Sequence, residues 1–264
     1  MRFASLGSGS AGNCLVVELV ANVSQSTRVL LDCGFGLRET EARLSKLGLM
    51  PEAITAILVT HEHDDHAKGA FKFAAKYNIP IWLTHGTLKM CERYLPSDYS
   101  NKLQFNVIDS HQTFEINGLQ ITPYPVPHDA REPTQFTFSN GKHRLGVLTD
   151  AGCSTPYIEN MLNACDALVL ECNHDINMLD NGPYSWSLKK RVGSRLGHLD
   201  NVSAAALLAK LDNTKLQHVI AAHLSAKNNA PHLARAALSQ VLNCTSEWVG
   251  IADQQTGFDW RGFS

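Results

Sequence analysis

The sequence predicts an α/β fold in which two β-sheets pack face to face with helices outside, a four-layer αββα sandwich. Each half of the chain is first rich in strands and then alternates strands with helices, which is typical of an α/β layer. No linker or low-complexity segment separates the halves. Clusters of histidine and carboxylate follow apolar strands, where open α/β folds place their ligands. We therefore expect a single domain over residues 1–264.

The composition indicates an ordinary globular protein. Of 264 residues, 44% are hydrophobic and 18% are charged. The net charge of −2 argues against a broad nucleic-acid-coating surface and leaves room for a local basic groove. We see no signal-peptide core and no apolar run of membrane-spanning length, so no membrane association is expected. Seven cysteines without a Cys-x-x-Cys pair predict free thiols and a cytoplasmic location.

Apolar runs and turn residues define the elements of the first half. Residues 7–13 are too rich in glycine and serine to form a strand or a helix, so we predict a loop there. The helix after the third strand ends at Gly48, a C-terminal cap signal. His85 begins another helix and is interpreted as a cap or surface residue. Strands are predicted at 2–6, 14–20, 28–32, 55–60 and 81–84, and helices at 40–47, 67–77 and 86–94.

The second half repeats this order. Asn117-Gly118 between apolar runs predicts a hairpin. Asp200 or Asn201 is a candidate N-cap for an alanine-rich helix. Strands are predicted at 105–108, 113–116, 119–124, 136–139, 145–150, 167–171, 218–223 and 248–252, and helices at 157–164, 201–211 and 231–242.

A cluster of metal-ligand side chains follows the strand at 55–60. It reads His61-Glu62-His63-Asp64-Asp65-His66. Imidazole with carboxylate suits zinc or a similar divalent ion, and the alternative is a surface histidine cluster without metal. His61 and His63 can point the same way in an extended turn, whereas Asp65 and His66 are adjacent. This spacing suggests two neighbouring metals, one for each pair.

Three later residues can complete such a pair of sites. His128, Asp150 and His223 each follow or end a predicted strand. We expect His128 to complete the ligand set of the first metal. Asp150 can bridge two cations, because a carboxylate has two oxygens. His223 is the last ligand expected along the chain.

Several other polar residues are candidates for substrate contact or support. Ser10 and Asn13, in the loop at 7–13, can present polar groups to an anion, or the loop can be only a tight turn. Cys172 and His174 follow a buried strand, and we expect His174 to line the cleft or hold a loop rather than bind metal. Residues 224–229, with Ser225, can shape the pocket rim.

A run of cations precedes His198. Lys189, Lys190, Arg191 and Arg195 form the solvated face of a helix, or they steer a phosphate backbone toward the metals.

The pattern His-x-His-x-Asp-His, with a distant histidine, Thr149-Asp150-Ala151-Gly152 and a late histidine, resembles the metallo-β-lactamase superfamily. More narrowly, the chain resembles the YycJ/WalJ-like branch of metallohydrolases. The features that carry this likeness are the loop Gly7-Ser8-Gly9-Ser10-Ala11-Gly12-Asn13, Val126-Pro127-His128-Asp129-Ala130, Glu171-Cys172-Asn173-His174-Asp175, Gly197-His198-Leu199 and His223-Leu224-Ser225.

The resemblance implies how the residues share their roles. Asp32 would support metal ligands from behind. Asp65 and His198 would be catalytic, with His198 a proton donor or phosphate clamp. Arg195 and His174 would lie near the substrate. One cation would be held by His61, His63 and His128, and the other by Asp65, His66 and His223, with Asp150 between them.

The resemblance also implies a reaction. Two divalent cations, zinc or manganese with iron possible, would activate a bridging water for hydrolysis. The branch implies a phosphodiesterase with 5′→3′ exonuclease activity on DNA and a role in DNA repair, so a nucleic acid or another phosphodiester is the expected partner. The alternatives are a small-molecule cyclic phosphodiesterase, a glyoxalase II-like thioester hydrolase and a non-catalytic metal-dependent scaffold.

Overall fold

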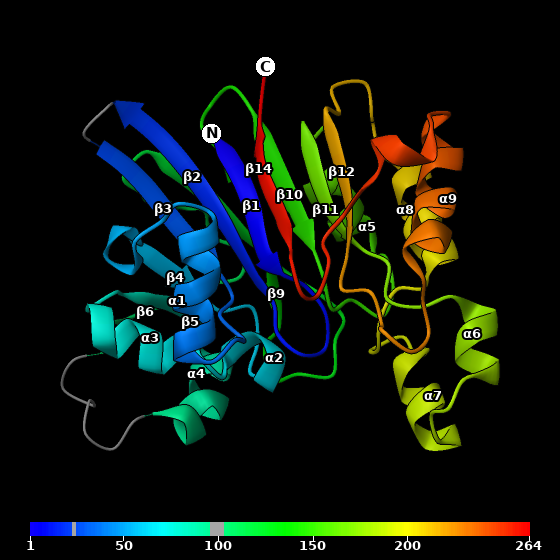
Figure 1. The fold of residues 1–264 in the computed structure, drawn as a ribbon, viewed down its shortest axis with the longest axis horizontal. Coiled ribbons are helices and arrows are strands. Elements are labelled where there is room, and N and C mark those ends of the chain that lie inside the picture. Colours follow the sequence, from blue (N-terminus) through cyan, green and yellow to red (C-terminus); the bar gives the residue numbers. More distant parts are fainter. Residues whose placement is uncertain (23–24, 96–102) are drawn as a thin grey trace.

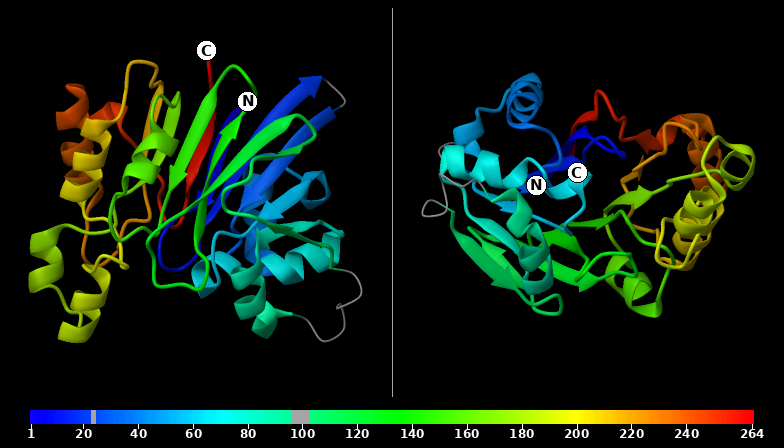
Figure 2. Two further views of the ribbon diagram at one scale, coloured as in Figure 1. Left: turned by 180° about the vertical axis from the view of Figure 1, so that it is seen from behind. Right: turned by 90° about the horizontal axis from the view of Figure 1, so that it is seen from below.

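Two seven-stranded sheets face each other in the computed structural model, which describes residues 1–22, 25–95 and 103–264. Helices lie on the outer side of each sheet, as the three views in Figure 1 and Figure 2 show. The predicted α/β sandwich is therefore confirmed. The first sheet has the order β14 (Phe258–Gly262), β1 (Arg2–Gly7), β2 (Cys14–Asn22), β3 (Gln25–Leu31), β4 (Ala56–Leu58), β5 (Ile81–Thr84) and β6 (Phe105–Ile108).

The second sheet repeats the plan of the first. Strands β3 to β6 are parallel, as are strands β10 to β13, and an antiparallel part completes each sheet. The carboxyl ends of the parallel strands therefore meet between the two sheets at one edge of the sandwich. The order is β13 (Gly250–Ile251), β12 (His218–Ala222), β11 (Ala167–Glu171), β10 (Arg144–Leu148), β9 (Thr134–Ser139), β8 (Leu119–Pro125) and β7 (Phe114–Ile116).

Three apolar clusters correspond to the three contacts between four layers. Phe3 and Phe136 belong to the cluster between the sheets. Leu44 and Phe71 pack helices against the first sheet, and Leu207 packs helices against the second. Burial of each such side chain contributes about 1.5–3 kcal/mol. The helices are α1 (Leu37–Lys46), α2 (Asp64–Ala67), α3 (Ala70–Tyr77), α4 (His85–Cys91), α5 (Pro156–Leu162), α6 (Ile176–Asn181), α7 (Trp186–Val192), α8 (Asn201–Lys210) and α9 (Pro231–Leu242), with short 3₁₀ turns at Pro51–Ala53, Glu92–Tyr94 and Ser246–Trp248.

The hairpin turn and the helix cap that local sequence signals predicted are both present in the structure. Asn117 and Gly118 have φ of 47° and 86°, as the hairpin turn requires. Asp200 caps α8 by accepting from the N–H groups of Val202 (2.8 Å) and Ser203 (2.9 Å). His85 is exposed at the start of α4, where Thr84 is the cap. None of the helices in the described ranges combines the length and apolarity needed to cross a membrane.

Several elements differ from the sequence prediction, and three of them have a clear reason. The edge strand β14 was not predicted, although Phe258 and Trp260 alternate with two exposed polar residues, because this alternation is short. Helix α6 was also not predicted, although Asp175 caps it by accepting from the N–H of Met178. The prediction of a strand from residue 248 was wrong at its start, since Trp248 belongs to a 3₁₀ turn that precedes β13.

Candidate metal centre

The candidate ligands come from both sheets and converge at the carboxyl ends of the parallel strands. The loop after β4 and helix α2 supply His61, His63, Asp65 and His66 from the first sheet. The segment after β8 supplies His128, the end of β10 supplies Asp150 and the end of β12 supplies His223. The structure thus brings together the seven residues that the sequence singled out as candidate ligands.

Three imidazole nitrogens form the first group. His63 Nδ1 lies 3.0 Å from His61 Nε2 and 3.2 Å from His128 Nε2. Ligands about 2.0–2.1 Å from one tetrahedral ion lie about 3.3 Å apart, so this spacing suits a single ion. His128 donates from its Nδ1 to the carbonyl oxygen of Gly197 (3.0 Å), which leaves the Nε2 lone pair free for a metal.

Two imidazoles and a carboxylate form the second group. Asp65 Oδ2 lies 3.5 Å from His66 Nε2 and 3.4 Å from His223 Nε2. The other ring nitrogen of each histidine donates to a buried carboxylate: His66 Nδ1 to Asp32 (2.7 Å) and His223 Nδ1 to Glu171 (3.0 Å). Both Nε2 atoms therefore face Asp65.

Asp150 lies between the groups. Its Oδ2 is 3.1 Å from His66 Nε2, and its Oδ1 is 4.0 Å from His128 Nε2. Within the described residues, Oδ2 is buried and accepts no well-aligned hydrogen bond. Such an atom is costly unless a cation satisfies it. Among the described residues this oxygen has only the ring nitrogen of His66 as a charged neighbour, and together with the donor set it fits a divalent metal pair.

Three of the strand-end residues have a left-handed backbone. Asp32, Asp150 and His223 have φ of 61°, 54° and 55°. Non-glycine residues adopt this conformation at a cost, and it concentrates at functional sites. In each case the turn aims a side chain back into the space between the sheets.

Asp32 supports ligands of both groups. It accepts from His66 Nδ1, from the N–H of Thr60 (2.9 Å) and from the Thr60 hydroxyl (3.0 Å). Since that hydroxyl donates to Asp32, we assign it as the acceptor from His61 Nδ1 at 2.9 Å. His61 is thereby held with its Nε2 lone pair toward His63.

Glu171 has the corresponding position in the second sheet. Its Oε1 accepts from His198 Nδ1 (2.8 Å) and from His223 Nδ1 (3.0 Å). Its Oε2 accepts from the N–H groups of Ala151 (3.0 Å) and Leu199 (3.1 Å). Although Glu171 can be grouped with Asp150, His198 and His223 as a metal cluster, its oxygens are already occupied. We therefore assign Glu171 the role of positioning the rings of His198 and His223.

The loop at 7–13 contacts the candidate ligands through the side chains of Ser8 and Asn13. Ser8 Oγ donates to Asn13 Oδ1 (2.9 Å) and accepts from the N–H of His223 (2.9 Å). Asn13 Nδ2 lies 3.3 Å from Asp65 Oδ2 and 3.1 Å from His66 Nε2. Because Ser8 and Asn13 are buried and bonded within the protein, the tight-turn interpretation suits them best.

Burial and carboxylates set the protonation of the histidines. Burial, with the positive charge of His66, lowers the pKa of His61 well below its usual value; burial also lowers that of His128. Burial would lower the pKa of His223 too, but Asp150 and the other carboxylates raise it to about 10. Carboxylates likewise raise the pKa of His66. His61 and His128 are thus neutral, ligand-ready imidazoles, whereas the second group retains positive charge that a metal would displace.

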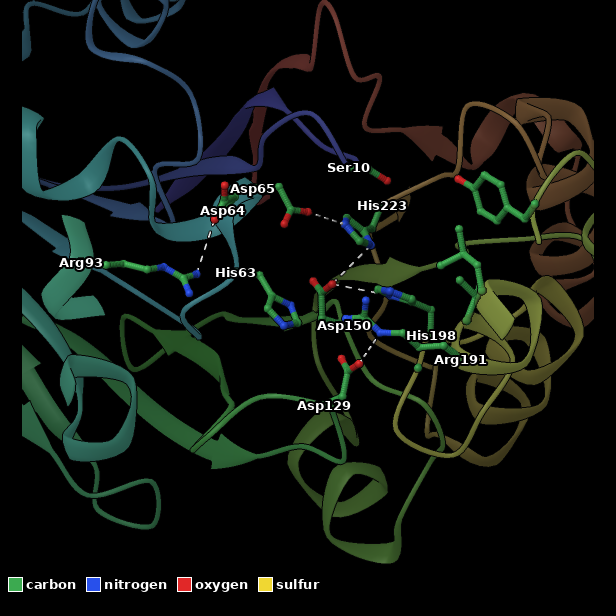
Figure 3. A pocket seen from close by; sticks show the side chains of 14 residues that line it. Ser10, His63, Asp64, Asp65, Arg93, Asp129, Asp150, Arg191, His198 and His223 are labelled. Carbon is green, nitrogen blue, oxygen red and sulfur yellow. Dashed lines mark hydrogen bonds and ion pairs between the residues drawn. The ribbon is translucent and has the colours of Figure 1, made fainter. Parts of the chain in front are cut away.

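A cavity of about 350 Å³ opens over the metal groups. Figure 3 shows His63, Asp65, Asp150, His198 and His223 directed toward its centre. The Nδ1 of His198 donates to Glu171, no hydrogen bond within the described residues engages its other ring nitrogen, and the side chain is 20% exposed. The lining residues are Ser10, His63, Asp64, Asp65, Arg93, Asp129, Asp150, Tyr184, Leu188, Arg191, Val192, Gly197, His198 and His223.

The structure separates the other candidate substrate residues. Ser10 lines the cavity, whereas Asn13, His174, Arg195 and Ser225 are not among its lining residues. His174 is buried beside Asn173 and lines a second cavity, and Arg195 is exposed. Ser225 is buried and accepts from the N–H of Asn228 (3.2 Å).

Sequence reasoning missed four residues of the site. Glu171 is a carboxylate at the end of a buried apolar strand, and this position was a signal that could have identified it. Arg93 and Tyr184 line the cavity from segments without a motif. Thr60 lies next to the motif, but nothing in the sequence shows that its hydroxyl joins Asp32 to His61.

Comparisons with known proteins agree with this geometry. A sequence model described as the beta-lactamase superfamily domain matches residues 27–223. Exodeoxyribonuclease YycJ of Bacillus anthracis is 36% identical over 255 residues, which cover 96% of this chain and 93% of the relative. Exodeoxyribonuclease WalJ of Streptococcus pneumoniae is 29% identical over 253 residues, covering 95% and 91%.

Solved structures support the same fold. The metallo-beta-lactamase fold protein YhfI of Bacillus subtilis aligns with a TM-score of 0.70 at 17% identity, over 98% of each chain. At that identity the likeness concerns the fold. The matched domain and the 36% identity concern the family, and they confirm the resemblance that the motifs indicated. The chain belongs to the beta-lactamase superfamily and has its metallo-β-lactamase fold.

Proposed function

We propose that this protein is a metal-dependent phosphodiesterase that removes nucleotides from DNA as an exonuclease. The observation that carries the proposal is the pair of ligand groups joined by Asp150 on the floor of an open cavity. The relatives named exodeoxyribonuclease, similar over nearly their whole length, favour DNA over other substrates of the fold.

The ligand assignment follows the two groups. His61, His63 and His128 would hold one cation, and Asp65, His66 and His223 the other, with Asp150 shared. Zinc or manganese suits this set, and iron is acceptable. When bound, such cations would activate a water molecule by lowering its pKa and would stabilise negative charge on phosphate oxygens.

The chain's own residues supply position and proton transfer. Asp32 and Glu171 fix the tautomers of His66 and His223 so that their Nε2 atoms face the metals. His198 is anchored through Nδ1 and presents Nε2 to the cavity, where it can donate a proton to the leaving oxygen. We further propose a cytoplasmic location, as the cysteine pattern predicts.

End-labelled single- and double-stranded DNA, incubated with manganese or zinc, tests the proposal. We expect products that shorten progressively from one end and that disappear in Asp65→Ala. We expect His198→Ala to lower kcat by about 10²–10⁴-fold while the metal content remains unchanged. Turnover of bis-p-nitrophenyl phosphate without DNA cleavage would instead favour a small-molecule phosphodiesterase. A fully metallated protein that cleaves neither would contradict the proposal and favour a thioester substrate.

A further inference from the structure

Helix α7 separates the metal cavity from a second cavity of about 680 Å³. Leu188, Arg191 and Val192 face the metal cavity, at the i, i+3, i+4 spacing of one helix face. The opposite face, with Trp186, Lys189 and Lys190, lines the second cavity. Any extended molecule that leaves the metal cavity over α7 therefore meets these three side chains.

The exposed surface of α7 is aromatic and cationic. None of its residues is buried, and Trp186 is 75% exposed, an unusual state for so large an apolar side chain. The Lys190 ammonium lies 5.1 Å from the centre of the Trp186 ring, and Lys227 lies 5.8 Å from that of Tyr184. Figure 1 shows α7 at the lower edge of the molecule, away from the layers that cover the sheets.

The charge of this helix departs from that of the whole chain. The protein has a net charge of −2, whereas α7 carries Lys189, Lys190 and Arg191 and no acidic residue. Arg191 is paired with Asp129 (2.5 Å), and Lys189 donates to the carbonyl oxygen of Asp180 (2.7 Å). In the part of the chain that the structure describes, neither lysine has a carboxylate partner. Asp180 and Asp200 also line the cavity, but the Asp200 carboxylate is engaged as the cap of α8.

We propose that this α7 face, formed by Trp186, Lys189 and Lys190, binds single-stranded DNA and leads it toward the metal cavity. Sequence-independent binding of single strands combines cations that follow the phosphates with exposed aromatic rings on which bases stack. Bases paired in a duplex cannot stack on Trp186, so the preference is for single strands. The inference rests on the proposed function and specifies its substrate.

The size of the helix sets the length of strand that is required. An α-helix with its side chains is about 10–12 Å wide. At about 3.4 Å per nucleotide along one strand, about three nucleotides cross it. A dinucleotide in the metal cavity therefore does not reach Trp186, whereas a 12-mer does.

Fluorescence anisotropy of a labelled 12-mer oligodeoxythymidine, measured in EDTA so that it is not hydrolysed, tests this proposal. We expect Trp186→Ala to weaken binding at least about fivefold, with most of the affinity restored in Trp186→Phe. We expect Lys190→Gln to reduce the slope of log Kd against log salt concentration by about 0.7. The advantage of the 12-mer over a dinucleotide should shrink in Trp186→Ala.

Matched controls lie at the other end of the sandwich. Trp248→Ala removes another exposed tryptophan, and Lys142→Gln removes an exposed lysine in the turn before β10. Both should bind the 12-mer like wild type. Equal affinity of wild type and Trp186→Ala, with DNA cleavage intact, would overturn the α7 proposal alone. A wild type that neither binds nor cleaves DNA would overturn the proposed function as well. A dimer that dissociates on Trp186→Ala, seen by sedimentation, would assign this face to a second copy instead.

Discussion

Two buried carboxylates, one on each side of the site, orient the histidine rings. Asp32 follows β3 in the first sheet and controls His66 directly and His61 through Thr60. Glu171 ends β11 in the second sheet and controls His198 and His223. Opposite charges outweigh the burial cost and lower the pKa of Glu171 to about 2, so it remains an acceptor. Orientation of the ligands therefore depends on one anion in each sheet.

We predict that Glu171→Gln weakens metal binding by about 10–100-fold and lowers hydrolysis. The amide has one acceptor oxygen, so it cannot accept from both imidazoles and from both backbone N–H groups. Metal content after dialysis, measured by mass spectrometry, together with the hydrolysis rate, checks this. The control Glu159→Gln alters a carboxylate in α5, which pairs with Lys210. Full metal content in Glu171→Gln would show that metal binding does not depend on the Glu171 carboxylate.

The sequence was sufficient to select candidate ligands that the structure brings together, because four of them lie within six residues and the others follow strands. It did not predict the partners of those ligands. A hydrogen bond such as that from Thr60 to Asp32 joins residues 28 positions apart, and no local pattern specifies it.

Tight backbone contacts between elements hold the ligand loop. A Cβ at Gly34 would lie 1.8 Å from the carbonyl oxygen of Asp65, and the Gly34 N–H donates to Asn13 (3.0 Å). The turn after β3, the loop at 7–13 and the start of α2 are thus in direct contact. Only glycine permits this approach.

We expect Gly34→Ala to displace Asp65 and to reduce both metal content and the free energy of unfolding, the latter by about 3 kcal/mol or more. Gly36→Ala, two residues later, is the matched control, because its φ is −63° and a Cβ there meets nothing within 4 Å. Circular dichroism in urea and metal analysis distinguish the two. Equal stability of both variants would contradict the packing argument.

A cross-strand charge cluster stabilises the first sheet far from the site. Glu18 in β2 is paired in register with Arg2 in β1 and Arg28 in β3, and its carboxylate contacts both guanidinium groups. Burial would raise the pKa of Glu18, but the two arginines lower it from its ordinary 4.5. Ionised Glu18 therefore favours the folded state.

Because the folded pKa is the lower one, this stabilisation is present above about pH 4.5 and is lost as the pH falls through the folded pKa. We expect Glu18→Gln to lower the free energy of unfolding by about 1–3 kcal/mol at pH 7, and the difference from wild type to shrink below pH 4.5. Urea unfolding at several pH values measures it. A difference that does not depend on pH would show that packing, rather than charge, is responsible.

At the scale of elements, the sequence predicted those with strong apolar periodicity. It missed β14, an edge strand whose pairing with β1 is set by the opposite end of the chain. It missed α6 as well, a helix with only Leu179 buried. Both elements are determined by tertiary contacts more than by their own pattern.

For the whole molecule, the ligand groups join the two sheets. In the first group, His61 and His63 come from the first sheet and His128 comes from the second. The second group likewise includes His223 from the second sheet. A bound metal would therefore stabilise the sandwich as well as the site.

We expect saturating zinc or manganese to raise Tm relative to protein in EDTA. Free metal at 100 times Kd stabilises by about 2.7 kcal/mol for each site, and each kcal/mol raises Tm by about 2–4 °C in a protein of this size. Differential scanning calorimetry measures the shift. In Asp150→Asn the shift should be smaller, and an unchanged Tm in metallated wild type would argue against ligands that join the sheets.

The overall sandwich was predictable because each half shows the same order of elements, and the repeat in topology confirms it. That the chain forms one domain remains a prediction. The arrangement of the α7 face beside the metal cavity was beyond the sequence, since residues 174–200 carry no strong periodicity.

The left-handed backbone at Asp32, Asp150 and His223 has a consequence for directed evolution. Glycine, and to a lesser degree asparagine, relieves this backbone strain but removes a ligand or its support. Asp32 and His223 also make buried hydrogen bonds that a substitution would lose, so selection for thermostability alone, carried out without metal, should act first at Asp150 and yield more stable but inactive variants. The site thus illustrates a stability–activity trade-off, which a library screened with metal present would avoid.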